Sequence, residues 1–143
     1  MNKFPFILVF ALLSLSAFVY AQETDSRGVE VKVSDVRGVI TANDVAEFDL
    51  VISNNVGKDM DFFIAKNFYS EKWRVTAEPY LLNVNSGSSK STKLRVNPTK
   101  FLTPADYKII IIVESRDKSF SKEVALDVKL IPIYFLSYTD IVL

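Results

Sequence analysis

Residues 107–114, Tyr-Lys-Ile-Ile-Ile-Ile-Val-Glu, are the most strand-like segment of the chain. Four consecutive isoleucines, Ile109–Ile112, are followed there by Val113, and β-branched side chains pack well on a pleated sheet. A segment that is apolar on both faces is typical of a strand that is covered from both sides. We therefore expect residues 107–114 to form a central strand of a sheet.

The segments around this strand alternate apolar and polar residues, with the period of two that places one face of a strand in the core. Residues 29–33 are Val-Glu-Val-Lys-Val, and residues 48–52 and 124–130 show the same alternation. Shorter strands are expected at residues 60–65, 73–75, 80–84 and 93–96. No long stretch after Ala21 has an apolar period of 3.6 residues, so we expect almost no helix.

Turn-forming residues separate these segments. Asn54–Lys58 and the loop Asn85–Lys90 are rich in Asn, Gly and Ser, and Asp35–Asp44 is turn-rich as well. Short strands at intervals of roughly 8–12 residues predict an all-β, antiparallel two-sheet sandwich of seven to eight strands over residues 29–130, with a barrel as the alternative. Parallel pairs are not expected, because they need long crossover connections.

The N-terminal residues 1–21 form a predicted signal peptide. Lys3 precedes an apolar run that starts at Phe6, and small residues stand three and one positions before a cut after Ala21. An uncleaved membrane anchor is the alternative, although the run is short against the roughly 20 residues that a spanning helix needs. We expect an exported protein, secreted or in the cell envelope, with residues 22–28 as a flexible lead-in.

The composition excludes several classes of function. The chain has neither His nor Cys, which removes Ser-His-Asp and Cys-His hydrolases, zinc fingers and any disulfide framework. Its 17 Lys and Arg balance 17 Asp and Glu, so it has no excess positive charge for binding nucleic acid. We expect no nucleic-acid partner, no catalytic residues, no cofactor and no metal.

Several segments resemble the immunoglobulin-like modules of bacterial and archaeal envelope proteins, of the CARDB (cell-adhesion-related) type and of the NPCBM-associated, α-galactosidase-linked type. The matching segments, which lie within residues 29–130, are 47–58, 73–75, 80–89, 94–98, the Tyr-led strand from 107, and 124–128. The chain lacks the cysteine pair of antibody-type domains. The resemblance implies an immunoglobulin-like sandwich that serves as a spacer, adhesion or sugar-associated module, often one of several in a larger surface protein.

Aromatic residues are the candidate ligand-binding group. Trp73 has Phe68, Tyr69 and Tyr80 nearby in the sequence, and together they form a candidate platform for stacking on sugar rings. We favour the other interpretation, that Trp73 fills the space between the two sheets, as a lone tryptophan in a sandwich usually does. A carbohydrate-binding module that uses Trp73, Tyr69 and Tyr80 is therefore an alternative function.

Two polar groups are also candidate sites. Asn54, Asn55, Asp59 and Asp61 supply oxygen atoms of the kind that Ca²⁺ prefers, but they lack the EF-hand spacing, and turn chemistry accounts for them. Glu71 and Asp49, with Asp59 and Asp61, are the carboxylates available for glycoside hydrolysis, and the sequence provides no apolar pocket to raise one pKa. These patterns favour turns and solvated strand faces over a calcium site or a glycosidase active site.

The C-terminal residues 131–143, IPIYFLSYTDIVL, form an apolar tail beyond the last expected strand. We interpret it as the start of a truncated next segment; an added edge strand and a sticky element for a partner are the alternatives.

The leading expectation is an exported, non-enzymatic structural or adhesion module with a protein or glycan partner at the cell surface. Membrane association would come only through an uncleaved signal or a missing C-terminal segment. Open sheet edges and the tail support a further alternative, a periplasmic chaperone or inhibitor-like interaction protein.

Overall fold

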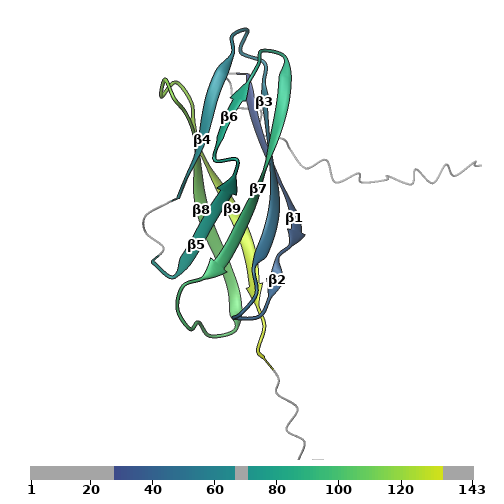
Figure 1. Ribbon diagram of the computed structural model, residues 1–143, viewed down its shortest axis with the longest axis vertical. Helices are drawn as coiled ribbons and strands as arrows, with labels where there is room; N and C mark the ends of the chain where they lie inside the picture. The colour runs from purple at the N-terminus through teal and green to yellow at the C-terminus, as the bar shows by residue number, and fades with distance from the viewer. Residues whose placement is uncertain (1–27, 67–70, 134–143) are drawn as a thin grey trace, which may run out of the picture.

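The computed structural model describes residues 28–66 and 71–133, which form two β-sheets packed face to face (Figure 1). One sheet has four strands in the order β1-β3-β7-β5, and the other has five in the order β2-β9-β8-β4-β6. The strands are β1 (Val29–Arg37), β2 (Val39–Ile40), β3 (Ala46–Asn54), β4 (Met60–Lys66), β5 (Trp73–Glu78), β6 (Leu81–Val84), β7 (Ser88–Pro98), β8 (Ala105–Ser115) and β9 (Ser121–Leu130). The predicted all-β, two-sheet sandwich is confirmed. The predicted signal peptide and residues 134–143 of the predicted tail lie outside the described residues.

The described residues contain nine strands, against the seven to eight expected, because β2 lies inside Asp35–Asp44, which we expected to be turn-rich. The β1–β3 register is irregular between Asp35 and Arg37. The chain then leaves the four-stranded sheet at Gly38 and joins the edge of the five-stranded one. A strand that changes sheets in this way cannot be recognised from alternation, since its apolar pattern is interrupted at the crossing.

The expectation of purely antiparallel pairing is wrong at one place. Val39 pairs with Lys129 and Ile40 with Leu130 in a parallel register, while all other pairs are antiparallel. The long crossover that a parallel pair requires is available here, because β2 and β9 are separated in the sequence by the rest of the sandwich.

The inner faces of both sheets form one apolar core, which contains β3 residues such as Phe48 and Leu50 and β8 residues such as Ile111. β8 lies between β9 and β4, so the prediction of a central strand is confirmed. Ile109 and Ile111 are buried in the core, whereas Ile110 lies half-buried on the outer face. A strand apolar on both faces therefore has one face in the core and one half-covered outer face.

The loop expected at Asn85–Lys90 is shorter than predicted, since β7 already begins at Ser88. Gly87 has a φ of 73°, and the Ser88 N–H donates to the Asn85 carbonyl oxygen (3.1 Å), which closes a tight turn. A positive φ at the glycine lets the chain reverse within few residues, and Ser88–Lys90 are then free to pair with β3.

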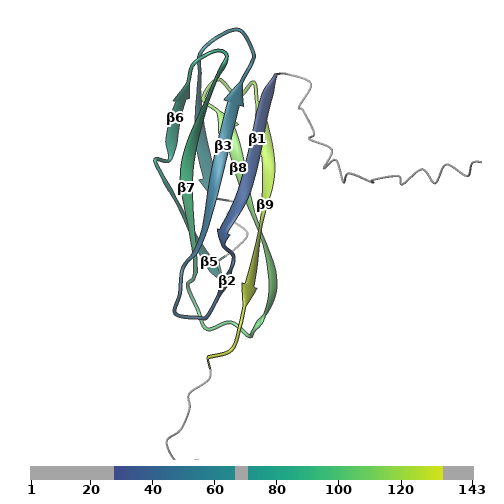
Figure 2. The same ribbon diagram turned by 90° about the vertical axis from the view of Figure 1, so that its right-hand side faces the viewer.

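The chain enters and leaves the sandwich at opposite ends. β1 begins at one end of the long axis and β9 finishes at the other, as Figure 2 shows from the side. The first end also carries the β3–β4, β6–β7 and β8–β9 connections, and there the Asn55 N–H donates to the Gly28 carbonyl oxygen (2.7 Å). We call this end the N-terminal pole and the opposite end the C-terminal pole.

Candidate functional site

The structure places two of the candidate aromatic residues in different environments. Trp73 is 3% exposed and contacts Tyr107 edge to face, with 5.2 Å between ring centroids. Tyr80 is 68% exposed and lies outside the strands, just before β6. Tyr69 and Phe68 lie outside the described residues. The indole of Trp73 therefore fills the space between the sheets, and only Tyr80 of the two described candidates presents its ring to solvent.

Asn54, the first of the weighed calcium ligands, is fully buried at the N-terminal pole. Its side-chain amide donates to the carbonyl oxygens of Lys58 (2.8 Å) and Val84 (2.9 Å), and its Oδ1 accepts from the Val56 N–H (3.1 Å). Both ends of the amide are thus occupied by backbone groups. Asn54 joins the β3–β4 connection to the end of β6 rather than facing a ligand.

The carboxylates near Asn54 are likewise occupied. Asp59 accepts from the Ser86 N–H (2.9 Å), and Asp61 pairs with Arg116 (3.0 Å) and accepts from Asn83 (2.8 Å). Residues 28–66 and 71–133 contain no group of three or more His, Cys, Asp or Glu side chains that could hold a metal ion. Asn54, Asp59 and Asp61, three of the four candidate calcium ligands, are therefore engaged in contacts within the protein.

The carboxylate of Asp117, at the same pole, has a strongly lowered pKa. The Ser119 hydroxyl donates to it (2.6 Å), Lys58 pairs with it (2.9 Å) and the Ser115 hydroxyl donates to it (2.7 Å). These donors hold the pKa of Asp117 well below its ordinary value of 3.8. The β8–β9 turn is thereby tied to the β3–β4 loop by a charge.

The carboxylates weighed for glycoside hydrolysis do not meet. Asp49 lies on the outer face of β3, Glu71 precedes β5 at a salt-bridge distance of 4.0 Å from Lys100, and Asp61 is paired with Arg116 at the N-terminal pole. These side chains lie on separate elements. Each one either forms an ion pair or lies on an outer face of the sandwich.

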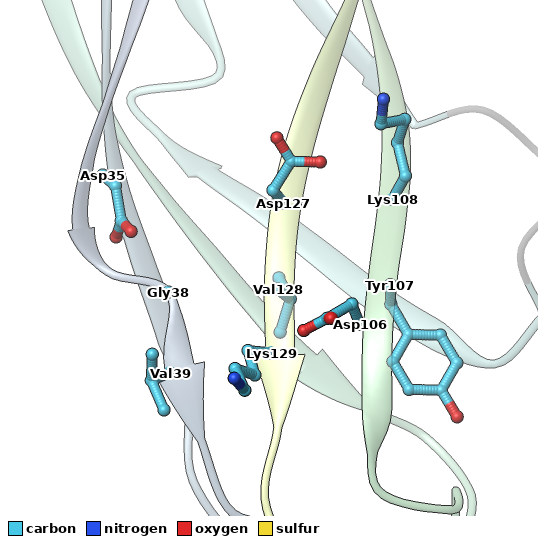
Figure 3. Close-up of a pocket in the computed structure, with 9 residues that line it drawn as sticks. All are labelled: Asp35, Gly38, Val39, Asp106, Tyr107, Lys108, Asp127, Val128 and Lys129. Carbon is cyan, nitrogen blue, oxygen red and sulfur yellow. The ribbon is translucent and has the colours of Figure 1, made fainter.

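A groove of about 470 Å³ lies where the β1–β2 segment meets the outer face of the five-stranded sheet (Figure 3). Asp35, Gly38 and Val39 form one wall, and residues 106–108 of β8 and 127–129 of β9 form the other. Figure 3 shows Asp35 and Asp127 on opposite sides of the gap between the two segments. No sequence pattern singled out this groove, because its walls come from four separate strands.

The groove carries three carboxylates that form no ion pair in the described part of the chain. Among the described residues, no ion pair within 4.0 Å involves Asp35, Asp106 or Asp127. Lys129 is the cross-strand neighbour of Asp106, and Lys108 is that of Asp127. With these two lysines the groove has one more negative than positive charge.

Gly38 creates the space for one of these carboxylates. A Cβ added at Gly38 would lie 2.6 Å from Asp35 Oδ2, closer than non-bonded atoms approach. The carboxylate of Asp35 therefore rests directly over the backbone where the chain crosses between sheets.

Beside this groove β9 has an open edge. The Lys129 N–H donates to the Gly38 carbonyl oxygen (2.8 Å) and the Ile131 N–H donates to the Ile40 carbonyl oxygen (2.9 Å). β2 pairs with β9 only at Lys129 and Leu130. In the described part of the chain, residues 121–127 of β9 therefore have a strand partner, β8, on one side only.

A second hollow, of about 380 Å³, lies at the C-terminal pole and is apolar. Phe101, which is 88% exposed, lines it together with Leu130–Ile133 and three other residues. The described residues include no helix with the length and apolar character needed to cross a membrane. The lining of this hollow comes from the β2–β3 and β7–β8 connections and from the end of β9 with the residues that follow it.

No family model and no curated protein matches the chain. Solved structures do share its fold. A FixG-related protein from Vibrio parahaemolyticus aligns with a TM-score of 0.59 at 12% identity, over 72% of this chain and 96% of that one. The cupredoxin domain of amoB from Nitrosocaldus yellowstonii aligns with a TM-score of 0.56 at 11% identity, over 73% and 88%.

A family 123 glycoside hydrolase from Clostridium perfringens is also similar, with a TM-score of 0.57 at 9% identity over 74% of this chain. The chain spans only 28% of that enzyme's length. Identities this low show the fold alone. The chain has an immunoglobulin-like, cupredoxin-like β-sandwich, and the likenesses identify no specific family within that class.

Proposed function

We propose that the protein is an exported, non-enzymatic structural or adhesion module of a cell-envelope protein. The observation that carries this proposal is that the chain enters at the N-terminal pole and leaves at the C-terminal pole. A module of this shape adds its full length to any polypeptide that contains it. β8 alone has 11 residues and, at about 3.3 Å per residue, spans about 36 Å.

Two features of the sequence support the cellular setting. Residues 1–21 have the charge, apolar run and cut site of a signal peptide. The resemblance to CARDB-type and NPCBM-associated modules favours the same surface role. The fold has many functions, so the proposal rests on shape and export together rather than on fold alone.

Labelling of intact cells with antibodies against the chain tests the setting. We expect surface labelling, and an intact mass that corresponds to a chain starting at Gln22. Retention inside the cell with Met1 still present would contradict export. Turnover of a glycoside or peptide by the purified protein, lost on substitution of Glu71 or Asp61, would contradict the non-enzymatic role.

Carbohydrate binding is a second candidate function, favoured by the 68% exposure of Tyr80. Because Trp73 is buried, its fluorescence should be blue-shifted and should not respond to glycans. Titration of glycans by calorimetry, with Tyr80→Ala as the variant, separates the two roles. Heat of binding that Tyr80→Ala removes would favour the carbohydrate-binding module, and no heat with any glycan would leave the structural role.

A further inference from the structure

We propose that the open edge of β9, residues 121–127, binds an extended polypeptide segment that carries basic side chains at alternate positions. This inference deepens the adhesive part of the proposed function by naming a partner class, and it rests on that function. Its test uses the purified protein, so binding can fail while the surface-labelling experiment succeeds.

The backbone of β9 supplies the hydrogen-bonding groups. The N–H groups of Lys129 and Ile131 point toward β2. Because backbone groups alternate sides along a strand, those of Glu123, Ala125 and Asp127 point the same way. The β2 strand ends its pairing at Lys129, so these groups extend the edge that β2 leaves open. An added strand would therefore continue the five-stranded sheet along β9.

The inner side of this edge requires apolar side chains from the partner. Val31 and Val33 of β1 and Val124 of β9 are half-buried and pack against the core. A strand placed beside β9 alternates its side chains between the two faces of the sheet. Every second side chain of the partner would face toward the core, where valine-like residues bury further apolar surface.

The outer side requires positive charge. Glu123 and Asp127 are exposed and lie on the outer face of β9, opposite Ile112 and Lys108 of β8. The groove lies at the end of this edge that is nearer the C-terminal pole. Its carboxylates include Asp35 and Asp127, which form no ion pair among the described residues. Lysine or arginine at alternate positions of the partner would pair with the carboxylates of Glu123, Asp127 and Asp35.

In the register centred on Ala125, the same acids disfavour a second copy of the chain as the partner. Two β9 strands paired antiparallel about Ala125 would place Glu123 of one opposite Asp127 of the other, and like charges directly opposite destabilise a pair. A basic extended segment avoids this repulsion, so we assign the edge to such a segment.

The probe is a short synthetic peptide of alternating Val and Lys, and the control is the same peptide with Glu in place of Lys. Amide hydrogen exchange of the full chain is followed by NMR. We expect the Val-Lys peptide to slow exchange at Glu123, Ala125 and Asp127 and the Val-Glu peptide to leave it unchanged. Equal binding of both peptides, or protection at another sheet edge only, would overturn the proposal.

Ala125→Pro blocks the edge while sparing the β8 pair, because the Ala125 N–H points away from β8. The matched control, Ala125→Ser, keeps the N–H. We expect Ala125→Pro to weaken the peptide about tenfold, through a lost hydrogen bond and a steric block, and Ala125→Ser to bind as the unchanged chain does. Equal affinity of the two variants would contradict pairing at this edge.

The charge variants remain informative if Ala125→Pro fails to fold. Asp35→Asn combined with Asp127→Asn should weaken the Val-Lys peptide about threefold at low salt, with the difference shrinking as salt is added. An affinity unchanged by these substitutions would remove the electrostatic basis. Association of the chain with itself at the same amides, without peptide, would assign the edge to a second copy and overturn the proposal.

Discussion

Asn54 is one of the few polar side chains buried in the sandwich. Its amide satisfies the Val84 and Lys58 carbonyl oxygens, and among the described residues no buried side-chain nitrogen or oxygen lacks a hydrogen-bond partner. Burying a polar group without a hydrogen-bond partner costs free energy. The Asn54 amide therefore stabilises the fold only when all of its hydrogen bonds are formed. Asn54 therefore holds the β3–β4 connection against the end of β6.

Replacing Asn54 with alanine should lower the free energy of unfolding by about 3 kcal/mol, because it strands buried backbone groups and removes packing. The measurement is denaturant unfolding, read as a shift of midpoint at constant slope. Ser53→Ala is the neighbouring control: it removes an exposed hydroxyl that contacts Ser89, and should cost less than about 1 kcal/mol. Similar losses in both variants would contradict the role assigned to Asn54.

Asp117 makes the stability of the same pole depend on pH. Because hydrogen bonds from Ser119, then from Lys58 and Ser115, lower its pKa in the folded chain, its contribution is fully present above its ordinary pKa of 3.8. The contribution is lost as the pH falls toward the lowered folded value. We expect the melting temperature to drop on acidification below about pH 4.

Asp117→Asn should melt at a lower temperature than the unchanged chain at neutral pH, and should lose less on acidification. Thermal unfolding between about pH 2 and pH 7 checks both expectations. Lys58→Met removes one of the donors and should reproduce part of the loss. Parallel pH profiles for Asp117→Asn and the unchanged chain would show that other carboxylates dominate acid unfolding.

At the scale of the element, the isoleucines of β8 point alternately into the core and onto the outer face of the sheet. Ile111 is fully buried between the sheets, and its neighbour Ile110 lies half-buried on the outer face. The two residues have the same side chain, the same strand and adjacent positions. They differ only in which face of the sheet they occupy, so they measure the contribution of core burial directly.

Ile111→Ala should lower the free energy of unfolding by about 3 kcal/mol, since it removes transfer energy and leaves a cavity. Ile110→Ala should cost about 1 kcal/mol or less, because its side chain is only half-buried. Denaturant unfolding of the two variants gives both numbers. Equal losses would mean that the outer face of β8 is covered as completely as the core.

At the scale of the whole molecule, the parallel β2–β9 pair lies on the path between the start of β1 and the end of β9. Its bonds from the Lys129 and Ile131 N–H groups lie across the direction that connects the start of β1 with the end of β9. A pull on the two ends would load both bonds at once, in shear. A module with this arrangement resists extension, which suits the proposed structural role.

Ile131→Pro removes the N–H that donates to the Ile40 carbonyl oxygen, at a side chain that is only partly covered. We expect a lower unfolding force in single-molecule pulling from the chain ends, and a loss of about 1 kcal/mol at equilibrium. Ile133→Pro, beyond the pair, is the control and should leave the force unchanged. Identical forces for both variants would place the mechanical resistance elsewhere.

The alternation of apolar and polar residues was enough to predict a two-sheet sandwich and a central strand at residues 107–114, because the period of a strand is a local property of the chain. The sequence also indicated that Trp73 had two possible settings. Its burial against Tyr107 was settled by tertiary packing, since strands that are not adjacent in the sequence meet there.

Only the tertiary structure placed β2 on the other sheet, paired it in parallel with β9, and left the β9 edge and the Asp35–Asp127 groove open. Each of these features depends on which strands pair and in what register, and pairing joins residues far apart in the sequence. The amino-acid sequence thus determined the layers and the core faces of this protein. The edges and grooves on which the proposed binding depends were determined by long-range pairing.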